Sequence, residues 1–230
     1  MPVSEGRLRP LRLFEAGAAT VAIALAVVGL ALYPLTTAPA VGALVRAVGS
    51  ERLTGLGTDA TLEAADAVRV FVLDPDAPSL PEQIDGEPAF DSFAVSHLVD
   101  VRKVMVPARW ATLALALLAG VWAGIRCRAA DGRRVVAASA RSAGWLLLAG
   151  AGLAVLAGVA DFDMLFSRFH GLFFEAGTWM FPADALLIRV FPLPFWQSAA
   201  ALWGALVLIC AAALFLAARR LRFTRGTYGV

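Results

Sequence analysis

Histidine and cysteine are both scarce in this sequence, with two of each among 230 residues. Cys127 and Cys210 are far apart in the chain and fall at different depths of the helices predicted below, so they form no close-spaced redox or zinc motif. We interpret both as unpaired thiols that pack like small apolar side chains. This pattern disfavours a disulfide-exchange enzyme, and no HExxH spacing indicates a zinc hydrolase.

Apolar residues, by contrast, make up 60% of the chain, and the mean hydropathy is +0.74. Soluble domains carry only about 45 to 50% apolar residues. Four apolar runs are each close to the roughly 20 residues that cross a bilayer, at about residues 13–33, 110–125, 143–160 and 198–218. We therefore predict an all-α integral membrane protein with four transmembrane helices, forming a single membrane domain over residues 1–230.

The first apolar run has a second interpretation, as a secretory signal. Residues 38–40, Ala-Pro-Ala, faintly resemble a small-residue cleavage site. The run is longer than the roughly 7 to 15 apolar residues of a signal peptide, and a proline lies inside the site itself. We expect an uncleaved first helix.

Arginine predicts the orientation of these helices. Three groups lie in the N-terminal tail, in the link between the second and third helices, and in the C-terminal tail: Arg7, Arg9 and Arg12; Arg126, Arg128, Arg133, Arg134 and Arg141; Arg219, Arg220, Arg222 and Arg225. Basic loops favour the cytoplasmic side, so we predict a multi-pass protein of the cell membrane with both termini inside. The acidic loop 34–109 and the loop 161–197 then face outward together. This charge pattern indicates membrane topology and no nucleic-acid partner.

The two outer loops are predicted to contain short amphipathic helices. Residues 40–48 and 58–73 have helical apolar spacing, and Thr58 or Asp59 is a candidate N-cap of the second segment. Four prolines and a glycine then interrupt residues 73–88, which we expect to be a mobile loop. Residues 161–197 are too polar to span the bilayer and rich in aromatics, so we predict an interfacial or re-entrant lid.

Each outer loop contains one of the two histidines. His97 falls on an apolar stripe of a helix that Asp91 can cap, and Asp100 is spaced to hydrogen-bond its imidazole. Pro107 is expected to end or kink this helix before Trp110 enters the bilayer.

The second histidine, His170, lies on a short helix that Asp161 or Asp163 can cap, with Arg168 nearby. Asp184 is expected to open a further helix over residues 185–190. Two histidines in loops on one side of the membrane, each with a polar group in reach, predict a functional site.

Four motifs resemble one known family. They are SHLVDVRKV at residues 96–104, FHGLFFEAGTW at 169–179, Asp184 followed by LLI, and FPLPFW at 191–196. This order is similar to that of the four-helix bacterial membrane family that includes the lipoprotein intramolecular transacylase, and it covers about residues 61–203. The proline-rich stretch 73–88 does not match the family pattern.

The resemblance implies an enzyme that transfers an acyl chain within a diacylated lipoprotein. The chain would move from the central glycerol carbon of a diacylglyceryl-cysteine to the amino group of that cysteine. His97 and His170 would be catalytic, supported by Asp100, Arg168, Trp179 and Asp184. Membrane lipid would surround the site, which lies at the outer face, and neither cofactor nor metal is implied.

Two alternatives from other classes stay open. A non-catalytic scaffold or partner-binding protein could have the same four helices, because a fold of this size need not carry chemistry. A zinc-dependent membrane hydrolase could use His97, His170 and Asp184, although loops far apart in sequence give no spacing signal for such a site.

Overall fold

The computed structural model describes residues 5–223, with side chains described for residues 12–222. Arg225 of the predicted basic C-terminal tail lies outside these ranges, as do the side chains of Arg7 and Arg9. Contacts divide the chain into two compact units, which are described separately. The bundle unit contains Met1–Ala31, Ala111–Ala154 and Gly204–Val230, and the loop unit contains Leu32–Trp110 and Val155–Trp203. The single membrane domain over residues 1–230 stays a prediction, because such units need not fold independently.

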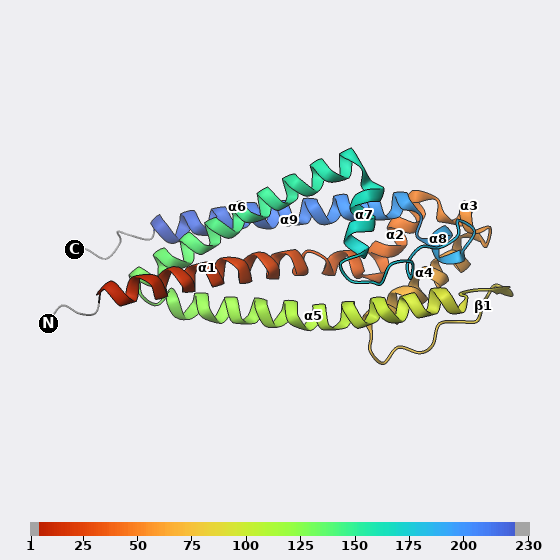
Figure 1. Cartoon of the computed structure of the whole chain (residues 1–230), viewed down its shortest axis with the longest axis horizontal. Helices are drawn as coiled ribbons and strands as arrows, with labels where there is room; N and C mark the ends of the chain where they lie inside the picture. Colours follow the sequence, from red (N-terminus) through yellow and green to blue (C-terminus); the bar gives the residue numbers. More distant parts are fainter. Residues whose placement is uncertain (1–4, 224–230) are drawn as a thin grey trace. The chain divides into compact units, whose positions relative to one another are not determined.

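Four long helices correspond to the four predicted apolar runs, although the first run, 13–33, continues beyond the end of its helix at Leu30 (Figure 1). They are α1 (Glu5–Leu30), α5 (Ser92–Arg126), α6 (Ala130–Ala160) and α9 (Leu193–Phe223). Each is long and apolar enough to cross a membrane, which confirms the predicted all-α class. With 35 residues, α5 is longer than the roughly 20 that span a bilayer, so its first turns extend beyond the apolar run.

Within the bundle unit, one polar cluster and one close approach connect α1 to α5. The Glu15 carboxylate accepts a hydrogen bond from Trp122 Nε1 at 2.8 Å and pairs with Arg126 Nε at 2.9 Å. A Cβ added at Gly29 would lie 2.2 Å from Thr112 Oγ1, so only glycine lets the two helices come this close. Small residues at helix contacts are typical of membrane bundles.

The loop unit is built from short elements. They are the 3-10 helix η1 (Tyr33–Thr36), α2 (Ala38–Val48), α3 (Ser50–Thr54), α4 (Gly57–Leu73), β1 (Gln83–Ile84), β2 (Glu87–Pro88), α7 (Phe162–His170) and α8 (Leu186–Val190). Val45 of α2, Ile84 of β1 and Val190 of α8 are each at most 2% exposed, and they belong to one apolar core. Burial of that core holds the loops together.

Residues 73–88 differ from the predicted mobile loop, because they contain an antiparallel hairpin. Ile84 pairs with Glu87 across the two-residue turn Asp85-Gly86, where φ is 54° and 80°. Positive φ at both positions is what a tight hairpin turn needs, and Asp-Gly is a preferred sequence for it. The prediction missed this signal among the neighbouring prolines.

Pro107 was predicted to end or kink its helix; α5 continues through it, so the helix does not end there, although proline lacks the N–H that would complete that turn. Two predicted helix starts are wrong. α4 begins at Gly57 without a side-chain cap, so neither Thr58 nor Asp59 caps it. α8 begins at Leu186 without one either, so Asp184 does not open it.

Candidate functional site

His97 lies near the start of α5, where the sequence fixes the helix N-terminus. The Ala94 N–H donates to Asp91 Oδ1 at 2.7 Å, which confirms the predicted cap. The charged residues Arg102 and Arg109 follow His97 before the apolar run begins, so the histidine precedes the apolar run 110–125. Its side chain is only 8% exposed.

His170 is the last residue of α7, whose N-cap is Asp161 rather than Asp163. Asp161 Oδ1 accepts from the Met164 N–H at 2.9 Å. His170 Nδ1 lies 2.9 Å from the Phe166 carbonyl oxygen, one turn earlier. A carbonyl can only accept, so Nδ1 must carry the hydrogen. In the neutral ring, Nε2 then has the lone pair and can accept a proton.

The fold brings the two histidines together within the loop unit. Their ring centroids are 6.4 Å apart and the planes differ by 26°. A pair at this distance can contact two parts of one small reacting group. Sequence spacing could not show this, because the two residues come from separate loops.

Aromatic side chains surround both imidazoles. Phe174 and Phe181 approach the His97 ring edge-on, with centroids 5.1 and 5.4 Å away. Phe166 and Trp179 lie 4.0 and 4.9 Å from the His170 ring. Phe181 was not singled out from the sequence, since it lies outside any periodic segment. These rings keep water away from the pair and lower the local dielectric.

The surroundings favour neutral imidazoles. Burial lowers the pKa of His97 to about 4, the nearby His170 lowers it as well, and Asp100 acts in the opposite direction. Burial also lowers the pKa of His170, although its hydrogen bond to the Phe166 carbonyl partly opposes this. Both rings are therefore poised to act as neutral groups at pH 7.

Asp100 does not form the predicted hydrogen bond with His97. Its Oδ1 accepts from Lys103 Nζ at 2.9 Å, and its side chain is 40% exposed. His97 Nδ1 is buried and has no hydrogen-bond partner among the described residues. Asp100 thus influences His97 through charge alone.

The other three predicted supporting residues differ in their placement. Trp179 contacts the His170 ring, and its Nε1 is buried without a partner in the described part of the chain. Arg168 and Asp184 are exposed, and no hydrogen bond or ion pair joins them to either histidine within residues 12–222. Over the same range, no three His, Cys, Asp or Glu side chains are grouped closely enough to hold a metal ion.

A family model described as "Lipoprotein intramolecular transacylase Lit" matches residues 13–196 of this chain. The chain belongs to that family. The expectation drawn from the motifs is confirmed, and the protein is a membrane-embedded acyltransferase with several spans. The scaffold alternative is thereby set aside. No curated protein sequence matches the chain.

Solved structures of the integral membrane Lit transacylase from Bacillus cereus show the same fold. One is 16% identical to this chain, covers 95% of it and 97% of its own length, and has a TM-score of 0.75. A variant with a histidine replaced by arginine is 15% identical, with coverages of 94% and 93% and a TM-score of 0.72. A variant with alanine at a histidine position is also 15% identical, with coverages of 94% and 95% and a TM-score of 0.71.

Proposed function

We propose that this transacylase acts on a lipoprotein whose N-terminal cysteine carries a diacylglyceryl group. The acyl chain on the central glycerol carbon moves to the amino group of the same cysteine, giving a lyso-form lipoprotein. The observation that supports this most directly is the buried pair His97 and His170, with a free acceptor nitrogen on the second ring.

We assign the base to His170. The cysteine amino group has an ordinary pKa of about 7.7 to 8.0, so it must lose a proton before it can attack. That first proton passes to solvent. As the N–C bond forms, His170 Nε2 accepts the second proton that the nitrogen gives up, while its Nδ1–H stays bonded to Phe166. The new N–C bond forms, the ester C–O bond breaks, and the leaving glycerol oxygen takes the proton back from the imidazolium.

His97 is assigned to the developing oxyanion of the ester carbonyl. With a pKa of about 4 it is neutral at pH 7 and keeps one N–H to donate. The rings of Phe174 and Phe181 exclude water on both sides of the imidazole. A fixed N–H donor stabilises an oxyanion more strongly in such a site than it would in water. No serine or cysteine nucleophile is needed, because amine and ester belong to one molecule. Such positioning can lower a barrier by roughly 7 to 11 kcal/mol.

The supporting residues take lesser roles in this proposal. Trp179 packs against the His170 ring and limits its rotation. Asp100 tunes the charge near His97. Arg168 and Asp184, both exposed, are assigned to the polar part of the lipoprotein substrate. Leu172 and Phe173, which follow α7 and are 78% and 48% exposed, face surrounding lipid in this proposal.

The proposed reaction is tested by tandem mass spectrometry of one lipoprotein from cells with and without this chain, because substrate and product have equal mass and only fragments locate the acyl chains. Lyso-form N-termini, with one acyl chain on the amine and a free glycerol hydroxyl, are expected only when the chain is present. A diacylglyceryl N-terminus with a free, unacylated amine in both strains would contradict the proposed substrate. An inactive His170 variant expressed at the same level serves as the matched control.

The proposed orientation puts both termini in the cytoplasm and the histidine pair at the outer face. Ser96 and Ser167 are exposed neighbours of the two histidines, so cysteines there should react with an impermeant thiol reagent in intact cells. Cys127 and Cys210 are removed first. Ala129→Cys, in the exposed basic link between α5 and α6, should react only after the membrane is opened. The reverse labelling pattern would refute the orientation.

A further inference from the structure

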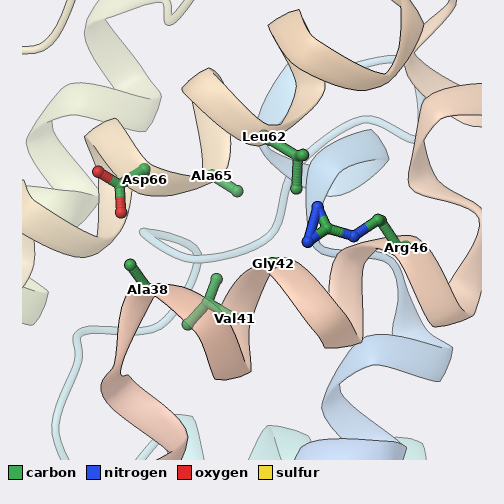
Figure 2. Close-up of a pocket in the computed structure, with 7 residues that line it drawn as sticks. All are labelled: Ala38, Val41, Gly42, Arg46, Leu62, Ala65 and Asp66. Carbon is green, nitrogen blue, oxygen red and sulfur yellow. The ribbon is translucent and has the colours of Figure 1, made fainter.

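A groove lies between α2 and α4 of the loop unit, and none of its lining residues takes part in the proposed reaction (Figure 2). Its volume is about 200 Å³. The lining residues are Ala38, Val41, Gly42, Arg46, Leu62, Ala65 and Asp66. The walls are thus mostly small and apolar, with one cation and one carboxylate among them.

The two charged residues of the groove are not equivalent. Arg46 and Asp66 lie at opposite ends of the row of lining residues (Figure 2). Asp66 Oδ1 already pairs with Arg69 Nε at 2.7 Å. No carboxylate pairs with the Arg46 guanidinium within residues 12–222. The groove therefore presents one uncompensated positive charge beside apolar walls.

Gly42 keeps the groove open beneath that charge. A Cβ added at Gly42 would lie 3.5 Å from Leu62 Cδ2 and 3.7 Å from Arg46 Nη2. The guanidinium therefore folds back over the glycine, next to the apolar wall. A larger side chain at this position would occupy the groove without removing the charge.

We propose that this groove binds an anionic phospholipid from the surrounding membrane. The Arg46 guanidinium takes the phosphate, whose geometry suits two parallel N–H···O hydrogen bonds. The glycerol and the first part of an acyl chain lie against Val41, Leu62 and Ala65. A soluble phosphate would use only the arginine, whereas a phospholipid uses both the charge and the apolar walls. The diacylglyceryl group of the lipoprotein substrate has no phosphate, so this lipid is not the substrate.

The test compares lipid retention by purified full-length protein in neutral detergent. Phosphatidylglycerol or phosphatidylcholine is added, and native mass spectrometry counts the bound lipid. Arg46→Gln is expected to retain roughly fivefold less phosphatidylglycerol, the effect of losing one basic contact to an anionic lipid. Arg52→Gln is the matched control, because the Arg52 side chain is 85% exposed and lies outside the groove lining. It should retain as much as the wild type.

Three results would overturn the proposal. Equal phosphatidylglycerol retention by wild type and Arg46→Gln would show that the arginine is not the contact. Equal retention of phosphatidylcholine would show that charge does not select the lipid. Complete competition by free glycerol phosphate would identify a soluble anion as the ligand. Gly42→Leu fills the groove but keeps Arg46, and it should also lose the lipid. If this variant does not fold, the comparison of phosphatidylglycerol retention between Arg46→Gln and Arg52→Gln is sufficient for the test.

Discussion

Replacing His170 with asparagine is expected to lower the rate of lyso-form lipoprotein formation by about 10² to 10⁴, the usual loss when a general base is removed. An asparagine amide can still donate to the Phe166 carbonyl that His170 Nδ1 contacts at 2.9 Å. It lacks the basic nitrogen that would take the amine proton. The loss should therefore appear in the rate, with little change in protein stability. Tandem mass spectrometry of the lipoprotein N-terminus over time, which locates the acyl chains by fragmentation, gives the rate.

Chemical rescue separates a base from a structural histidine. In His170→Gly the ring is missing, and added imidazole should restore part of the rate by occupying the vacated space. Ser167→Ala, an exposed neighbour on α7, is the control that should keep the wild-type rate. If the asparagine variant turns over near the wild-type rate, the base lies elsewhere. A large loss without any imidazole rescue would point to a structural role.

The spanning helices were predictable because the bilayer imposes a simple requirement. Every backbone polar group must be satisfied within the segment, so a long apolar run in a chain of this composition has to be a helix. The caps Asp91 and Asp161 were predictable for a local reason, since each side chain bonds an N–H three residues ahead.

Contacts of a side chain that has two possible partners at the same spacing were not predictable from the sequence. Asp100 is three residues from both His97 and Lys103, so spacing alone allows either partner. Lys103 is the partner because the Asp100 side chain is partly exposed, so both charges of the ion pair stay hydrated. The His97 ring packs among the aromatic side chains instead. The 6.4 Å separation of the histidines depends on how two loops pack, which no local pattern encodes.

Replacing His97 with leucine is expected to lower the rate by about 10² to 10³, the cost of losing one oxyanion donor. The same change should leave the protein at least as stable at pH 7. His97 Nδ1 is buried without a partner among the described residues, and such a group costs about 1 to 3 kcal/mol. Leucine removes that cost and suits the neighbouring rings of Phe174 and Phe181. A thermal melt beside the rate measurement tests both effects.

The pH dependence of protein stability is a second, independent test of His97. Burial lowers the pKa of His97 from 6.5 to about 4, so the folded state binds its proton less readily than the unfolded chain. The contribution of His97 to the free energy of unfolding of the wild type should therefore be fully present above pH 6.5, and it should fall as the pH drops from 6.5 toward 4. His97→Leu should lose less stability over that window, and Asp100→Asn should lower the His97 pKa further.

His97→Gln completes the series, because glutamine keeps an N–H donor and does not titrate. If His97 acts as a neutral donor, the glutamine variant should keep clearly more activity than the leucine variant. If His97 must instead gain or lose a proton during turnover, the two variants should be equally inactive. That second outcome would reassign His97 from oxyanion donor to acid or base. The predicted fall in wild-type stability below pH 6.5 does not depend on which catalytic role His97 has.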